Sequence, residues 1–139
     1  MALSAPVKLA AKRIVVIDDD PITCDIVAAT LGAAGYRVDV VHDGDDALES
    51  IYGATTDLVI LDCNLPGKAG MVVLRDIRTD HMLKSLPVIM LTSRTSDWHA
   101  RLAFETGASA YIKKPFDPAE LVILVARALT GASLPQRAL

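Results

Sequence analysis

The chain has 139 residues, the length of one ordinary domain. Hydrophobic residues make up 52% and charged residues 22%, which excludes a disordered or collagen-like protein. The 14 Lys and Arg and 17 Asp and Glu give a net charge of −3, without the basic excess that would favour direct binding to nucleic acid or an anionic membrane.

No secretory or membrane-spanning segment is expected. The longest strongly apolar runs, such as 121–126, fall far short of the roughly 18 residues of a spanning helix. Cys24 and Cys63 are too far apart for a metal-binding pair, and we interpret both as small hydrophobic residues in a reducing compartment. These features predict a cytoplasmic protein.

Five short apolar runs are candidate strands. In chain order they are 14–17, 38–41, 58–61, 88–91 and a weaker one at 110–112. The segments between them have apolar residues at helical spacing. Near-continuous apolar strands alternating with helices predict a doubly wound α/β fold, in which helices cover both faces of a parallel sheet. The run at 38–41 alternates most and is therefore the expected edge strand.

Cap and turn residues predict where helices begin. Pro21 suits the first turn of the first helix, Asp43 and Gly44 are expected to open the second, and Asp117 can cap the last, followed by a proline. We expect one folded domain at 12–130, an N-terminal tail at 1–11 and a C-terminal tail at 131–139.

Polar residues follow four of the five strand candidates directly. These are Asp18-Asp19-Asp20, the single acid Asp62, Thr92-Ser93 and Lys113-Lys114. Parallel strands place their carboxyl ends along one edge, where open α/β sheets bind ligands. We therefore expect these residues to converge in space.

Such a convergence indicates phosphoryl-transfer chemistry. Crowded carboxylates repel one another unless a cation offsets them, and an oxygen-only donor set without His or Cys favours Mg²⁺. Asp62 can act as a nucleophile toward phosphorus. A metal ion, the Lys114 ammonium and the Thr92 hydroxyl would together hold the oxygens of the transferred group.

Each motif alone also has a purely structural interpretation. The aspartate run can be a helix N-cap, Thr92 can cap the following helix, and the lysine pair can be a solvated surface pair. Their joint placement at successive strand ends favours the functional interpretation.

At these residues the sequence resembles the receiver domain of two-component response regulators, the family typified by the single-domain chemotaxis regulator. The similarity covers about 12–129. It rests on Ile-Val-Val-Ile-Asp-Asp-Asp-Pro, Leu-Val-Ile-Leu-Asp, Leu-Pro-Gly-Lys-Ala-Gly, Val-Ile-Met-Leu-Thr-Ser and Tyr-Ile-Lys-Lys-Pro-Phe. The resemblance implies a flavodoxin-like (β/α)5 fold with strand order 2-1-3-4-5.

The resemblance also implies roles for individual residues. Asp62 would accept a phosphoryl group from a sensor histidine kinase or a histidine phosphotransfer protein. Asp18 and Asp19 would hold Mg²⁺, with Asp19 and Asp62 as direct side-chain ligands and Asn64 contributing its backbone carbonyl. Lys114, rather than Lys113, matches the family's lysine before a proline.

A conformational switch is implied as well. Thr92 would move toward the phosphoryl group and Tyr111 would turn inward, so that the face formed by the fourth helix, fifth strand and fifth helix reports the state to a downstream protein target. Arg94, Ala100 and Phe104 are candidate members of this partner face with Tyr111. For Phe104 a core position is the preferred interpretation, Tyr111 is also interpretable as an aromatic packed on the fifth helix, and Trp98 stays open.

Two other classes of function fit the sequence less well. A haloacid-dehalogenase-type phosphatase needs a second aspartate two residues after its nucleophile, but Asn64 stands there after Asp62. A phosphorylation-independent adaptor would not need the acid, hydroxyl and lysine set. We therefore expect a stand-alone switch that does not turn over an external substrate, either monomeric or weakly dimeric upon phosphorylation.

Overall fold

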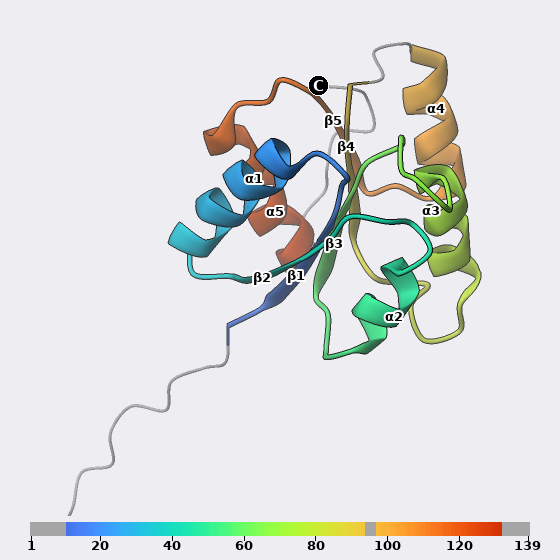
Figure 1. Cartoon of the computed structure of the whole chain (residues 1–139), viewed down its shortest axis with the longest axis horizontal. Helices are drawn as coiled ribbons and strands as arrows, with labels where there is room; N and C mark the ends of the chain where they lie inside the picture. Colours follow the sequence, from blue (N-terminus) through green and yellow to red (C-terminus); the bar gives the residue numbers. More distant parts are fainter. Residues whose placement is uncertain (1–10, 94–96, 132–139) are drawn as a thin grey trace, which may run out of the picture.

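A computed structural model describes residues 11–93 and 97–131. Five parallel strands form one sheet in the order β2-β1-β3-β4-β5, and five helices connect them (Figure 1). In chain order the elements are β1 Arg13–Ile17, α1 Pro21–Ala33, β2 Arg37–Val41, α2 Ala47–Tyr52, β3 Leu58–Leu61, α3 Gly70–Thr79, β4 Val88–Thr92, α4 Asp97–Thr106, β5 Ala110–Lys113 and α5 Pro118–Thr130. The predicted flavodoxin-like fold and its strand order are confirmed.

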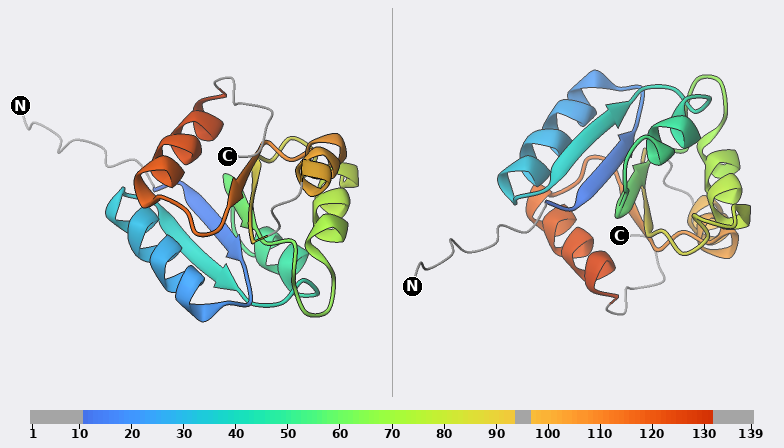
Figure 2. Two further views of the ribbon diagram at one scale, coloured as in Figure 1. Left: turned by 90° about the horizontal axis from the view of Figure 1, so that it is seen from above. Right: turned by 90° about the horizontal axis from the view of Figure 1, so that it is seen from below.

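Helices cover the sheet on both faces. Helices α1 and α5 lie on one face, and α2, α3 and α4 lie on the other (Figures 1 and 2). Because side chains alternate along a strand, β1 sends Ile14 and Val16 into the core under α1 and α5, and Val15 and Ile17 into the core under α2 to α4. All five residues of β1 are buried, which explains the unbroken apolar run at 14–17 after Arg13.

The edge position expected for the second strand is also confirmed. Strand β2 pairs only with β1 among the described strands, in the register Arg13↔Arg37 to Ile17↔Val41. Four of its five residues keep some exposure, whereas β3 and β4 are buried throughout. One-sided burial accounts for its alternating sequence.

The helix starts agree with the sequence at two of three places. Asp20 caps α1 and Asp117 caps α5, in each case through a side-chain bond to the backbone, with a proline in the first turn. The second helix is different, because it begins at Ala47 rather than at Asp43-Gly44. The Gly44 N–H donates to the Pro66 carbonyl at 3.1 Å, which ties this segment to the loop before α3 and delays the helix.

Arg13, the first residue of β1, links several segments at the amino ends of the strands. Its side chain is almost fully buried, and its Nε lies 2.6 Å from Asp39 Oδ2 on β2. The guanidinium also donates to the Ser50 carbonyl near the end of α2 and to the Thr56 hydroxyl before β3. Strand β2, helix α2 and the loop before β3 therefore share one buried cation, and the Ser50 carbonyl accepts from it in addition to the Gly53 N–H that closes the end of α2.

The tails expected at 1–11 and 131–139 fall almost entirely outside the described residues. Within 11–93 and 97–131, no helix has the length and apolar character needed to cross a membrane.

Candidate functional site

The sheet brings the predicted polar residues to one edge. The Asp62 N–H donates to the Ile17 carbonyl at 3.0 Å, and the Lys114 N–H donates to the Thr92 carbonyl at 2.9 Å. These backbone bonds continue the parallel pairing one step past the strands. They place the residue after β3 beside the end of β1, and the residue after β5 beside the end of β4.

Lys114 joins two of the carboxylates. Its Nζ lies 2.7 Å from Asp18 Oδ2 and 3.4 Å from Asp62 Oδ2. Carboxylate oxygens of Asp18, Asp19 and Asp62 also lie within 4.8 Å of one another. The ammonium thus offsets part of the negative charge that this cluster of acids accumulates.

Burial makes the charges of the cluster costly. Asp18 is 2% exposed, Asp62 is 5% exposed, and Asp19 is open to solvent. Burial raises the pKa of Asp18 above its ordinary value, and the charge of Asp62 adds to this effect, whereas the hydrogen bond from Lys114 opposes it. Burial acts to lower the pKa of Lys114, but its contacts with Asp18 and Asp62 outweigh burial and raise it. The ammonium is therefore held in its charged form.

The donor set fits a hard divalent cation. All the ligand atoms offered by Asp18, Asp19 and Asp62 are carboxylate oxygens, the type that Mg²⁺ prefers. The exposure of Asp19 leaves one side of the cluster open to water and to a phosphoryl oxygen. The Asn64 N–H donates to Asp62 Oδ1 at 3.3 Å, which fixes the loop whose Asn64 carbonyl is the fourth predicted ligand.

The third aspartate of the run has a structural role. Asp20 Oδ1 accepts a bond from the Ile22 N–H at 3.1 Å, and its Oδ2 accepts one from the Thr23 hydroxyl at 2.6 Å. The N-cap interpretation of the aspartate run is therefore correct for Asp20.

The two residues of the predicted switch lie on the neighbouring strands β4 and β5. Thr92 ends β4 and is fully buried, as is Tyr111 on β5. The Phe104 ring on α4 is partly buried against the core, with its centroid 6.5 Å from that of Tyr111. Phe104 thus contacts Tyr111 and belongs to the border of the core.

The expected partner face is only partly exposed in this conformation. Ala100 and Tyr111 are buried and contribute almost no surface, whereas Trp98 on α4 is 62% exposed. Arg94 lies outside the described residues.

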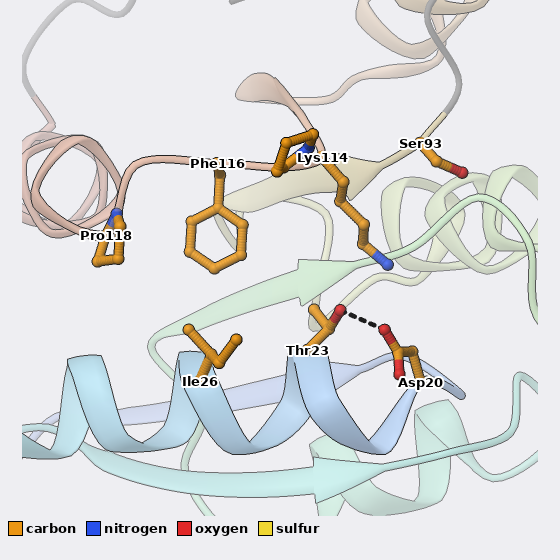
Figure 3. A pocket seen from close by; sticks show the side chains of 8 residues that line it. Asp20, Thr23, Ile26, Ser93, Lys114, Phe116 and Pro118 are labelled. Atoms are coloured by element: carbon orange, nitrogen blue, oxygen red, sulfur yellow. Dashed lines mark hydrogen bonds between the residues drawn. The ribbon is translucent and has the colours of Figure 1, made fainter.

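A pocket adjoins the acid cluster between α1 and the segment that follows β5 (Figure 3). Its polar lining includes Asp20, Thr23 and Lys114, and its apolar lining includes Ile26 and Phe116. In Figure 3 the Phe116 ring points toward Ile26, while the Lys114 side chain extends toward the beginning of α1. The acid cluster is therefore flanked by a partly apolar hollow.

Two contacts of the site have no counterpart in the sequence interpretation. His42 Nδ1 donates to the Asp18 carbonyl at 3.0 Å, and the Cys24 thiol donates to the same oxygen at 3.2 Å. Burial raises the pKa of Cys24 to about 11, with the negative charges of Asp18 and Asp20 adding to it, so the thiol stays protonated. The sequence gives one clue to His42, its position directly after the second strand. This clue gains meaning only once that strand is seen to pair with β1.

Comparison with known proteins identifies the family. The model of the response regulator receiver domain matches residues 14–126, which is most of the chain. The chain belongs to the response regulator receiver domain family. Members of this family are signalling phosphoacceptors rather than enzymes that turn over an external substrate, so the phosphatase alternative is not supported.

Solved receiver structures are similar over nearly their whole length. The N-terminal receiver domain of Klebsiella pneumoniae RstA, activated with BeF3, is 41% identical, with a TM-score of 0.80 over 85% of this chain and 98% of that one. The chemotaxis response regulator CheY4 of Vibrio cholerae is 30% identical, with a TM-score of 0.80 over 86% and 99%.

A third structure contains a metal ion. The receiver domain of the sensor histidine kinase PA1611 from Pseudomonas aeruginosa PAO1 is 30% identical, with a TM-score of 0.80 over 87% of this chain and 99% of that one. That receiver domain has a magnesium ion coordinated in its active site cleft.

Proposed function

We propose that this receiver domain is a phosphorelay switch in which Asp62 accepts a phosphoryl group from a phosphohistidine of a sensor histidine kinase or histidine phosphotransfer protein. The observation that carries the proposal is the position of Lys114 Nζ, which contacts both Asp18 and Asp62 within a cluster of three carboxylates. At the carboxyl ends of the strands, the Lys114 ammonium and a metal ion held by the acids would bind a group that carries several charged oxygens.

The transfer exchanges one bond to phosphorus for another. An Asp62 carboxylate oxygen forms the new bond, the histidine nitrogen to phosphorus bond breaks, and the electron pair leaves with the imidazole, which takes a proton. Mg²⁺ held by Asp18, Asp19, Asp62 and the Asn64 carbonyl would supply charge neutralisation at the transferred group. Lys114 and Thr92 would hold its remaining oxygens, and most of the rate would come from this positioning.

The switch would connect this chemistry to a downstream protein target. The Thr92 hydroxyl would gain a charged acceptor when Asp62 is phosphorylated, and Tyr111 lies on the neighbouring strand β5. The ring contact between Tyr111 and Phe104 gives a packing route from the site to α4. The partner face of α4, β5 and α5 would then differ between the two states.

We place the protein in the cytoplasm, as a monomer or a weak phosphorylation-dependent dimer. Its two cysteines are buried and neither forms a disulfide, which suits a reducing compartment. We propose no direct binding to nucleic acid or to a membrane, since a net charge of −3 does not attract these anionic partners.

Phosphorylation by a small phosphodonor tests the proposal. The parent protein, incubated with the donor and Mg²⁺, should acquire one acid-stable, hydroxylamine-labile phosphate. Asp62→Asn should acquire none, while Asp117→Asn, which alters an acid outside the cluster and keeps a helix-capping side chain, should label like the parent. Label on Asp62→Asn would reject Asp62 as the acceptor, and an unlabelled parent would favour the adaptor alternative.

A further inference from the structure

His42 lies at the end of the edge strand, yet it contacts the acid cluster. The residue directly follows β2, and its ring is exposed to solvent. Its Nδ1 lies 3.0 Å from the Asp18 carbonyl oxygen, so the imidazole donates a proton in this bond. An exposed ring adds little to the hydrophobic core, so the polar contacts of Nδ1, the hydrogen bond to the Asp18 carbonyl and a 3.9 Å approach to Cys24 Sγ, are what His42 contributes at this site.

The remaining polar groups of Asp18 are already bound elsewhere. Its N–H donates to the Val41 carbonyl at 3.0 Å, its Oδ1 accepts from the Asp20 N–H at 2.9 Å, and its Oδ2 accepts from Lys114. These bonds fix the strand end and the Asp18 side chain. The carbonyl is different, because it belongs to the peptide that joins Asp18 to Asp19.

Because a peptide unit is planar, the direction of the Asp18 carbonyl also sets the direction of the Asp19 N–H and the start of the Asp19 residue. The imidazole of His42 and the thiol of Cys24 both donate to this carbonyl, and they therefore hold the plane. The Asp19 side chain is exposed, so its own packing restrains it weakly. Its place beside Asp62 then depends on the backbone that carries it.

We propose that His42 is a positioning residue for the cation site, which orients Asp19 toward Asp62 through its hydrogen bond to the Asp18 carbonyl. The inference rests on the proposed function, in which Asp19 and Asp62 are the direct side-chain ligands of Mg²⁺. His42 touches neither the metal ion nor the phosphoryl group, and it acts through the peptide that it holds. The thiol of Cys24 supports the same carbonyl from the core side.

Direct titration with Mg²⁺ tests this role without any phosphodonor. Isothermal calorimetry near neutral pH should give His42→Leu a roughly tenfold weaker affinity than the parent, as found when partners that hold metal ligands are removed. His42→Asn should stay within about threefold of the parent, because its side-chain N–H can occupy the position of the imidazole donor. The matched control is His81→Leu, which alters an exposed histidine in the loop after α3 and should leave the affinity unchanged.

A second measurement separates positioning from a loss of structure. The initial rate of phosphorylation by a small donor is recorded against Mg²⁺ concentration at a temperature where every variant is folded by circular dichroism. In His42→Leu the half-saturating Mg²⁺ concentration should rise by about the same factor as the dissociation constant. The rate at saturating Mg²⁺ should match the parent, because excess metal ion compensates for a displaced ligand.

The outcomes distinguish this inference from the proposed function. If Asp19→Asn binds Mg²⁺ as tightly as the parent, the proposed metal site itself is wrong. If Asp19→Asn loses affinity while folded His42→Leu keeps it, the metal site stands and the role of His42 is rejected. Equal losses of Mg²⁺ affinity in His42→Leu and His42→Asn would also reject the role, because the affinity would then not depend on the hydrogen bond donated to the Asp18 carbonyl.

Discussion

Three consecutive aspartates after β1 occupy three different environments. Asp18 is buried and paired with Lys114, Asp19 is exposed within the acid cluster, and Asp20 turns back to cap α1. Their side chains have the same chemistry, so the difference comes from where β1 ends and α1 begins. One residue completes the strand, one faces the open side of the site, and one satisfies the first N–H groups of the helix.

The cap assignment predicts how stability depends on pH at Asp20. The hydrogen bond from Thr23 lowers the pKa of Asp20 below its ordinary value of 3.8. A lowered carboxyl pKa stabilises the fold above the ordinary value, and this contribution is lost as the pH falls through the lowered pKa. Asp20→Ala should therefore have a lower unfolding midpoint than the parent at neutral pH, and the difference should shrink in acid below 3.8.

Thermal unfolding followed by circular dichroism across this pH range checks the prediction. The same variant should retain phosphorylation by a small donor, since Asp20 caps a helix and lies outside the cluster of Asp18, Asp19 and Asp62. A loss of Mg²⁺ affinity as large as that of Asp19→Asn would show that Asp20 is a ligand after all.

The loop before α2 and the loop before α3 pack so closely that two positions require glycine. A Cβ atom on Gly44, before α2, would lie 1.8 Å from the Lys68 carbonyl oxygen. A Cβ atom on Gly67 would lie 2.2 Å from Asp45 Oδ2, and Gly67 has a φ of +72°, which favours glycine by itself. The loop before α2 therefore braces the loop that follows Asp62 and carries Asn64.

Substitution of Gly44 tests this bracing. Gly44→Ala should destabilise the fold by about 1–3 kcal/mol, because the added methyl group forces two backbone segments apart. Gly32→Ala is the matched control, since nothing lies within 4 Å of its Cβ position in α1, and it should be neutral or more stable by up to about 1 kcal/mol. Chemical denaturation gives both values, and equal stabilities of the two variants would show that the loops are not locked.

At the scale of the whole molecule, the site gathers residues from four of the five strand ends. Asp18 follows β1, Asp62 follows β3, Thr92 ends β4 and Lys114 follows β5. A ligand that binds this edge links elements on both sides of β3, and it therefore stabilises the folded state as a unit.

Mg²⁺ should accordingly raise the midpoint of thermal unfolding. At a concentration 100 times its dissociation constant, the metal ion should stabilise the fold by about 2.7 kcal/mol. For a domain of this size that corresponds to a shift of roughly 10 °C. Differential scanning calorimetry in Mg²⁺, in chelator and in NaCl of equal ionic strength measures it.

Substitutions of the proposed Mg²⁺ ligands test whether this shift in the unfolding midpoint comes from the metal site. Asp19→Asn and Asp62→Asn should each show a smaller Mg²⁺-dependent shift than the parent. A parent shift that NaCl reproduces in full would mean that general screening, and not a metal site, stabilises the protein.

The sequence determined the strands, the parallel sheet and the edge strand, because burial on both faces leaves a pattern that is local in the chain. It also predicted which residues share the site edge, since strand ends in a parallel sheet must lie together. The predicted start of α2 was wrong, because the observed start depends on the contact between Gly44 and Pro66, which lies 22 residues further along the chain. Likewise, only the paired strands revealed that His42 reaches the Asp18 carbonyl. Such contacts join segments that no local pattern connects, and they exist only once the chain is folded.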